Sequence, residues 1–160
     1  MAYEKTLVLI KPDALYKSLT GAILTSLSEA RLKIVGAKIV KVSQELAEKH
    51  YCDLKCNLSN KFGEDKGCKI YEGVLDYLKG KYHTDRVFAL VYAGEDAVKK
   101  IRELAGETNP EKASPNSIRG KYGRINSQID VLENVIHCSD SLESANREIE
   151  LWFKPEEVVE

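Results

Sequence analysis

Apolar and polar positions along this chain fall into blocks that predict four strands separated by helices. Short apolar runs with the length and composition of strands occupy residues 6–10, 32–42, 86–92 and 128–136. Between and after these runs, apolar residues recur at spacings of three and four, as they do on one face of an α-helix. The predicted helices cover residues 19–30, a segment that begins at Ser43, and residues 71–78, 94–104 and 142–153. Ser43 is expected to cap its helix, and Gly106 is expected to close the helix at 94–104.

Helices that lie between strands predict an α/β fold, in the form of an α+β or α/β sandwich. Periodicity alone leaves open whether the sheet is parallel or antiparallel. The polar segment 56–69 contains glycine and asparagine and predicts a loop. Residues 107–123 predict a second loop, with a short helical turn near 117–119. With 160 residues, the whole chain 1–160 is expected to form one domain.

Composition narrows the classes of partner. The chain is 43% hydrophobic and 31% charged, which is typical of a globular protein, and its net charge of −1 argues against nucleic acid or an anionic membrane as the main partner. A basic segment with one aromatic, 119–124, leaves a nucleic-acid-binding module as an alternative, but it is short. No apolar run reaches the ~18 residues of a membrane span. The first residues lack a signal-peptide pattern, so we expect a cytoplasmic protein.

The four cysteines are expected to be reduced thiols, because no secretory signal is present. A zinc set made of His50, Cys52, Cys56 and Cys68 is the alternative. Its spacing lacks the paired C-x-x-C pattern of structural zinc sites, so free thiols are favoured.

One histidine lies at the junction between an expected strand and an expected helix. The apolar run that ends at Ile136 is followed by His137, and small and acidic residues then precede the last helix. Free backbone N–H groups at such a junction suit a phosphate, and histidine is a competent nucleophile near neutral pH. A structural histidine, hydrogen-bonded at the helix start, is the alternative. Asp140 and Glu143 are expected to form a capping box for the last helix, and Ser139 and Ser141 are the alternative caps.

Three cationic residues are candidates for binding phosphate. Lys11 directly follows the first strand, Arg102 neighbours Ile101 on the apolar side of its helix, and Arg119 lies in a loop with glycine. Arginine forks bind phosphate oxygens in pairs. Solvated side chains or surface ion pairs are the alternative for each residue. The chain has no G-x-x-x-x-G-K-[ST] motif, which excludes a P-loop.

Five short motifs are distributed along the chain. Residues 134–141 read N-x-x-H-x-S-D-S and are followed by L-E-S-A-N-R-E-I-E-L-W-F. The other motifs are K-P-D at 11–13, G-E-T-N-P at 106–110, I-R-G at 118–120 and F-K-P-E-E at 153–157. In this order they resemble the motifs of nucleoside diphosphate kinases, and the resemblance covers nearly the whole chain. It implies a ferredoxin-like β-α-β-β-α-β core with a four-stranded antiparallel sheet and added helices, and a homo-oligomer, either a hexamer or a tetramer, built from dimers.

The resemblance also implies the chemistry. A nucleoside triphosphate phosphorylates His137, which then phosphorylates a nucleoside diphosphate, in a ping-pong reaction with broad base specificity. Mg²⁺ is expected to bind through the nucleotide phosphates rather than to protein ligands. The implied roles are sugar and phosphate contacts for Lys11 and Asn134, phosphate binding for Arg102, Thr108 and Arg119, a place near the transferred phosphate for Tyr51, and support of the histidine by Ser139 and Glu148.

Two stretches depart from the family pattern. An insertion is expected near 56–69, and the segment near 124–132 is expected to be lengthened. The first displaces the aromatic that stacks on the base in relatives, for which Tyr71 is the candidate and Phe62 the alternative. A nucleotide-binding regulator that has lost efficient transfer is therefore the competing function.

Overall fold

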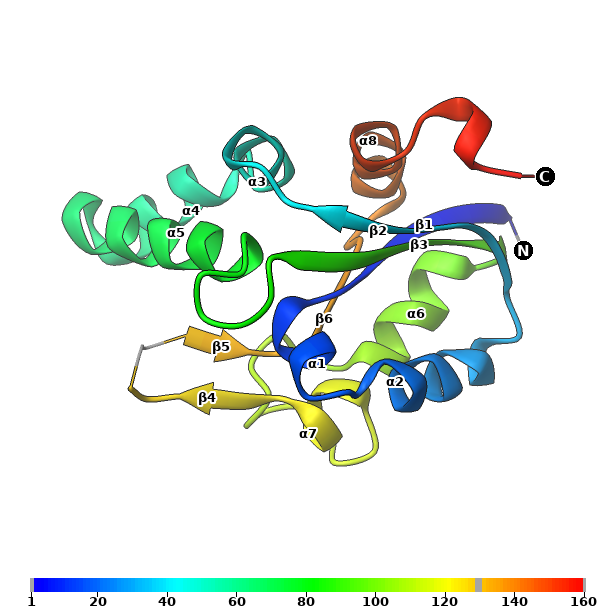
Figure 1. Ribbon diagram of the computed structural model, residues 1–160, viewed down its shortest axis with the longest axis horizontal. Helices are drawn as coiled ribbons and strands as arrows, with labels where there is room; N and C mark the ends of the chain where they lie inside the picture. The colour runs from blue at the N-terminus through cyan, green and yellow to red at the C-terminus, as the bar shows by residue number, and fades with distance from the viewer. Residues whose placement is uncertain (1, 129–130, 160) are drawn as a thin grey trace.

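A four-stranded antiparallel sheet organises the computed structural model, which describes residues 2–128 and 131–159 (Figure 1). The strands run in the order β2-β3-β1-β6, and each neighbouring pair is antiparallel. This is the sheet expected from the resemblance. The strands are β1 (Tyr3–Ile10), β2 (Lys33–Lys41), β3 (Arg86–Glu95) and β6 (Ile136–Cys138).

Helices cover both faces of this sheet (Figure 1). On one side lie α2 (Thr20–Leu27) and α6 (Ala97–Ala105), and on the other lie α3 (Gln44–His50) and α8 (Leu142–Trp152). Along β1, Leu7 and Leu9 therefore join one buried cluster while Val8 and Ile10 join the other. A strand that is buried on both faces reads as a continuous apolar run, which explains why residues 6–10 show no alternation.

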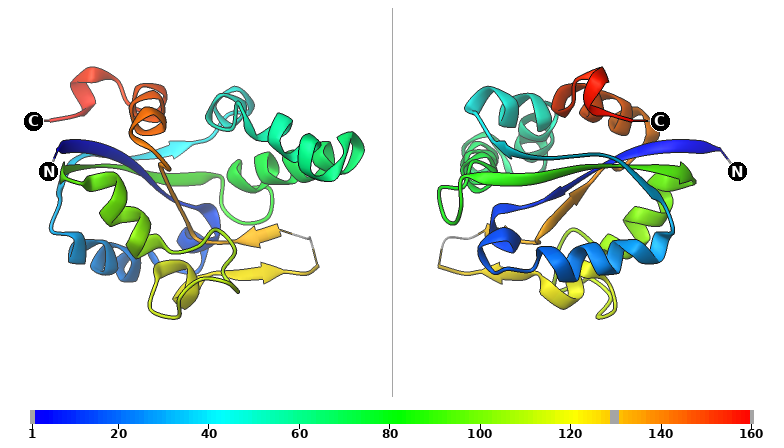
Figure 2. Two further views of the ribbon diagram at one scale, coloured as in Figure 1. Left: turned by 180° about the vertical axis from the view of Figure 1, so that it is seen from behind. Right: turned by 45° about the vertical axis from the view of Figure 1, so that its right-hand side comes forward.

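The remaining elements extend the sandwich. They are α1 (Pro12–Tyr16), η1 (Ser28–Ala30), α4 (Leu54–Phe62), α5 (Glu64–Leu78), α7 (Ile118–Tyr122), β4 (Arg124–Asn126), β5 (Val131–Glu133) and η2 (Pro155–Glu157). Both chain ends lie at one end of the sheet, whereas α4, α5 and the β4–β5 hairpin lie at the other (Figures 1 and 2). No helix in residues 2–128 and 131–159 is long and apolar enough to cross a membrane.

The loop predicted for residues 56–69 is wrong, because these residues lie in the antiparallel helices α4 and α5. The glycines that indicated a loop have other tasks. Gly63 has φ +86° and forms the turn between the two helices. Gly67 lets the helices approach closely, since a Cβ there would lie 2.5 Å from the backbone nitrogen of Ser59.

The single strand predicted for 128–136 is also wrong. Residues 131–133 form β5, which pairs with β4, and 136–138 form β6, which pairs with β1. The N–H of Ile136 donates to the carbonyl of Asn134 at 2.7 Å, so a γ-turn centred on Val135 separates the strands. Residues 129 and 130 of the prediction lie outside the described residues.

Local signals at helix ends are confirmed. Ser43 accepts a hydrogen bond from the N–H of Leu46, and Gly106 ends α6 with φ +82°. The final helix is capped by Ser141, which accepts from the N–H of Ser144. The Asp140–Glu143 capping box is therefore wrong, and one of the two alternative serine caps is used.

A buried carboxylate joins the β4–β5 hairpin to the rest of the molecule. Glu133 is fully buried and accepts hydrogen bonds from Lys17 and Arg124, each at 2.6 Å, and from Asn126 at 2.9 Å. Nε2 of His83 lies 3.0 Å from Oε1, the oxygen that also accepts from Asn126, whereas Lys17 and Arg124 donate to Oε2. Burial raises the pKa of Glu133, but the hydrogen bonds from Arg124 and Lys17 outweigh it and hold the pKa at about 2.

We expect Glu133→Gln to lower the free energy of unfolding by about 2 kcal/mol at pH 7, because Lys17 and Arg124 lose their anionic partner. The folded pKa lies below the unfolded value of about 4.3. This stabilisation is therefore complete above pH ~4.3 and is lost as the pH falls towards ~2. Urea unfolding at pH 7 and pH 3 measures the difference, with exposed Glu29→Gln as control. An equal deficit at both pH values would contradict it.

Candidate active site

A cavity of about 380 Å³ lies beside β6 and collects most of the residues identified from the sequence. It is bounded by the ends of β1 and α3, by α4, α6 and α7, and by the start of α8. Segments far apart in the chain therefore meet here. The predicted residues that line it are Lys11, Tyr51, Arg102, Thr108, Arg119, Asn134, His137 and Glu148.

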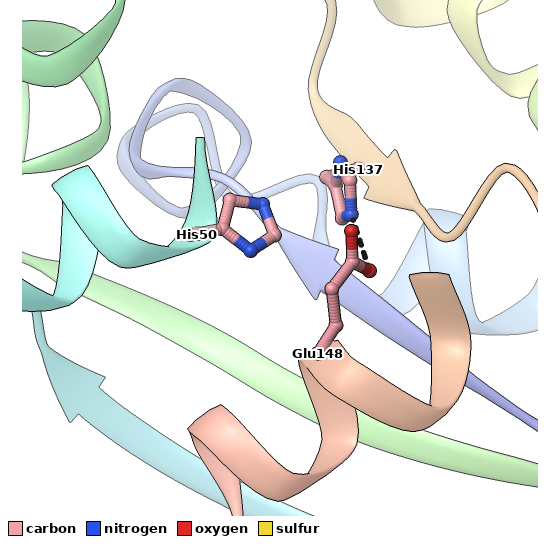
Figure 3. Close-up of side chains that lie close together, drawn as sticks. All are labelled: His50, His137 and Glu148. Carbon is pink, nitrogen blue, oxygen red and sulfur yellow. Dashed lines mark hydrogen bonds and ion pairs between the residues drawn. The ribbon is translucent and has the colours of Figure 1, made fainter. Parts of the chain in front are cut away.

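His137 lies in β6 opposite Leu9, and its ring is held by a carboxylate (Figure 3). Its Nε2 lies 3.0 Å from Oε2 of Glu148 on α8. The buried hydroxyl of Ser139 donates to the same oxygen at 2.7 Å. Because a carboxylate only accepts, Nε2 carries the proton and Nδ1 keeps its lone pair. Ser139 does not line the cavity but supports Glu148 from behind.

The turn before His137 is strained. Val135 has φ +60°, a conformation that costs a β-branched residue about 1–3 kcal/mol. Two buried hydrogen bonds hold it: its N–H donates to Asp13 at 3.2 Å, and its carbonyl accepts from the N–H of Lys11 at 2.9 Å. The turn allows Asn134 and His137 to line the same cavity.

Lys11 is buried with a neutral partner. Its Nζ donates to Oδ1 of Asn134 at 2.9 Å, and Nδ2 of Asn134 donates to the carbonyl of Thr108 at 3.0 Å. Burial and then the positive charge of Arg119 lower the pKa of Lys11, Asp13 offsets only part of this effect, and the resulting pKa is about 8. Within the described residues the ammonium thus donates to an amide and has no direct ion pair, which favours an anionic ligand.

The two arginines differ in their exposure. Arg119 is 7% exposed and donates to the carbonyls of Gly106 at 2.8 Å and Ile136 at 3.0 Å. Its Nε is buried and has no partner among the described residues. Arg102 lines the cavity as well, but it is exposed. The expectation that it faces inward beside Ile101 is therefore wrong, because only its neighbour points into the core.

The predicted aromatics divide into one inside the cavity and two outside it. Tyr51 lines the cavity, and burial, followed by the charge of Glu148, raises the pKa of its phenol, so it is a neutral donor. Tyr71 packs against a core cluster and Phe62 lies exposed, and neither lines the cavity. The lining residues of α4 are instead Leu54 and Asn57, so base stacking on Tyr71 or Phe62 stays a prediction.

His50, to which no active-site role was assigned from the sequence, is 3% exposed and lines the same cavity. Its ring centre lies 4.4 Å from that of His137, and its Nδ1 accepts a hydrogen bond from Nε1 of Trp152 at 3.1 Å. Its i, i+3 spacing from buried Ala47 is the sequence signal that could have placed His50 on the inner face of α3.

The zinc set that combined His50 with three cysteines is not formed. Cys52 and Cys56 are exposed free thiols, and Cys68 is a free thiol as well. Within the part of the chain that the structure describes, three potential ligand atoms come within 4.8 Å of one another only at His50, His137 and Glu148.

Comparisons with known proteins agree with this geometry. The family model described as nucleoside diphosphate kinase matches residues 4–158. A nucleoside diphosphate kinase of Pyrococcus furiosus is 44% identical over 157 residues, which is 98% of this chain and 87% of that protein. An NDP kinase structure from Pyrobaculum aerophilum is 32% identical, with a TM-score of 0.85 over 99% of this chain and 100% of that one. A Borrelia burgdorferi enzyme, solved with vanadate and ADP as a transition state mimic, is 30% identical, with a TM-score of 0.84 over 99% and 91%.

The lowered pKa of Lys11 predicts how anion binding depends on pH. We expect the affinity for ADP to be constant below pH about 8 and then to fall, approaching tenfold per pH unit, as free Lys11 loses its proton. Calorimetric titration between pH 6.5 and 10 measures it. Lys11→Arg stays protonated over this range and should remove the dependence. The same decline in the arginine variant would assign it to another group.

Proposed function

This chain belongs to the nucleoside diphosphate kinase family and is a nucleotide phosphotransferase, and from that premise we propose that it transfers the phosphate through a covalent phosphohistidine on His137. The carrying observation is the 3.0 Å contact between Nε2 of His137 and Oε2 of Glu148 (Figure 3). Because a carboxylate accepts, Nε2 donates its proton, and Nδ1, the other ring nitrogen, has no hydrogen-bond partner among the described residues. A free lone pair inside a cavity with cationic walls is what a phosphoryl acceptor requires.

The reaction has two matching steps. In the first, Nδ1 of His137 forms a bond to the terminal phosphorus while the bond to the bridging oxygen breaks, and the diphosphate leaves. In the second, a terminal oxygen of another diphosphate attacks the same phosphorus, and the N–P bond breaks. Positive charge develops on the imidazole as the N–P bond forms, and the Glu148 carboxylate stabilises it. Ser139 keeps this carboxylate in position.

Three cationic side chains with different partners bind the phosphates in this proposal. Lys11 and Arg119 are held by an amide and by carbonyl groups, which leave their charge available. Arg102 is exposed at the cavity wall and is free to follow the phosphates. Asn134 and Thr108 position Lys11, and the neutral phenol of Tyr51 is placed to donate to the transferred phosphoryl group.

Mg²⁺ is proposed to arrive on the nucleotide and to neutralise phosphate charge when it is bound. The residues fit this arrangement. The one close group of three potential ligands within the described ranges contains two imidazoles, whereas Mg²⁺ prefers oxygen. We therefore assign no direct protein ligand to it.

Broad base specificity is part of the proposal. The part of the cavity lining that comes from α4 includes one apolar side chain, Leu54, and one amide, Asn57. An amide both donates and accepts, so it accommodates different base edges. The homo-oligomer built from dimers and the cytoplasmic location stay expectations from the sequence.

A phosphohistidine is directly measurable. After mixing with ATP and Mg²⁺, intact mass should show one added, acid-labile phosphoryl group that GDP removes with formation of GTP. His137→Ala should lose the adduct and GTP formation yet still bind ADP, because the cations remain. A folded protein that binds nucleotide without adduct or GTP would instead be the nucleotide-binding regulator.

The support of the histidine predicts a graded loss. We expect Glu148→Gln to lower kcat about 100-fold, because the charge that stabilises the imidazolium is removed, with little change in ADP affinity. Ser139→Ala should lower kcat less. Glu150→Gln, an exposed change on the same helix, is the matched control. Loss of ADP binding in Glu148→Gln would show that the carboxylate stabilises the folded site rather than the charge of the imidazolium.

A further inference from the structure

The group formed by His50, His137 and Glu148 has the composition of a zinc site. Two imidazoles and a carboxylate provide the three protein ligands of many catalytic zinc centres. Their potential ligand atoms lie within 4.8 Å of one another, and all three residues line the cavity. An enzyme whose substrates carry divalent cations thus has a potential trap for transition metals at its nucleophile.

The hydrogen bond from Trp152 decides whether His50 can act as a ligand. An indole N–H only donates, so Nδ1 of His50, 3.1 Å away and buried, must present its lone pair to it. Burial, followed by the nearby His137 and Lys11, lowers the pKa of His50, so its ring is neutral. A neutral imidazole with an accepting Nδ1 carries its proton on Nε2.

This tautomer directs a proton, not a lone pair, towards the group. One ring nitrogen of His50 faces His137, and the other faces away towards α8, the helix of Trp152 (Figure 3). Nε2 is buried and has no hydrogen-bond partner among the described residues. Metal-bound histidines normally donate their second N–H to a carbonyl or carboxylate. Here the second nitrogen accepts instead, which is the wrong polarity for a ligand.

The other two members of the group lack such a block. The proton that Nε2 of His137 donates to Glu148 can move to Nδ1, which has no partner within the described ranges. Glu148 offers a carboxylate. His50 is therefore the member on which closure of a three-ligand site depends, and a pair of ligands alone binds a metal weakly.

We propose that Trp152 is a positioning residue that keeps transition metals off the nucleophile, by fixing His50 in the tautomer that cannot coordinate them. This inference rests on the proposed function, because the hydrogen bond from Trp152 would protect His137 as the nucleophile. The tautomer and the metal affinity are properties of the protein without nucleotide, so they can be tested separately from phosphate transfer.

The chain contains a single tryptophan, which allows a minimal change. Replacing tryptophan throughout by an analogue with sulfur in place of the indole N–H alters only position 152 and keeps the ring shape. Trp152→Phe makes the same test genetically. Without the N–H donor, His50 can move its proton to Nδ1 and present Nε2. We expect Zn²⁺ to bind at least about tenfold more tightly than to the unmodified protein.

Calorimetric titration with Zn²⁺, without nucleotide, measures this affinity. His50→Phe is compared in both backgrounds, because exposed thiols such as Cys52 and Cys56 give every variant the same background binding. The site gained in Trp152→Phe should disappear in Trp152→Phe/His50→Phe, whereas His50→Phe alone should match the unmodified protein. Thermal unfolding checks that each variant is folded, and the sulfur analogue serves if Trp152→Phe is not.

Two results would overturn the proposal. One is tight Zn²⁺ binding by the unmodified protein that His50→Phe removes, which would make the group a metal site. The other is a ¹⁵N spectrum with the proton of His50 on Nδ1.

In activity assays, Zn²⁺ should inhibit the Trp152→Phe enzyme at lower concentration than the unmodified one. An absence of transfer in both would count against the proposed function, while the binding result would still decide the metal proposal.

Discussion

The strained turn at Val135 is the constraint on which the site depends. Its φ of +60° is held by hydrogen bonds to Lys11 and Asp13, at the end of the central strand β1. The side chain of Lys11 then bonds to Asn134, on one side of the turn, and Arg119 donates to the carbonyl of Ile136 on the other. The strain of about 1–3 kcal/mol is thus offset by contacts that also position Lys11 and Arg119, the cations proposed to bind phosphate. A relaxed strand in its place would separate Asn134 from His137.

Two kinds of charge burial serve two purposes in this molecule. Around Glu133, a carboxylate meets Lys17 and Arg124 directly, and the paired charges fasten the β4–β5 hairpin. Around the cavity, the hydrogen bonds of Lys11 and Arg119 within the described residues go to amide and carbonyl oxygens, which do not cancel their charge. The first arrangement is complete without a ligand. The second becomes electrostatically complete when an anion enters, and this difference separates a structural charge cluster from a binding site.

Features set by local chemistry could be predicted from the sequence, and features set by distant contacts could not. The run 6–10, the Ser43 cap and the Gly106 helix end depend on neighbouring residues and are confirmed. Helix α4 and the first part of α5 were missed, whereas the predicted helix 71–78 lies within α5. Gly67 serves close packing rather than flexibility, a use visible only with both helices in place. The turn at Val135 has no local signal, since a β-branched residue is the wrong type for positive φ.

The resemblance to the family brought together residues that spacing could not, such as Glu148 and His137. It left out His50, whose state depends on Trp152, 102 residues away in the chain. Tertiary contacts therefore decide not only where these side chains lie but also which of their nitrogens carry protons.

The two neighbouring imidazoles show how such contacts specify chemistry. Glu148 draws the proton of His137 to Nε2, and Trp152 leaves the proton of His50 on Nε2 by occupying Nδ1. Both protons lie on the inner side of the group, where a metal would need lone pairs. Of the four ring nitrogens, only Nδ1 of His137 keeps a lone pair without a partner in the described chain. Phosphoryl transfer needs one such lone pair, and a metal trap needs more than one, so the same hydrogen bonds favour the first and oppose the second.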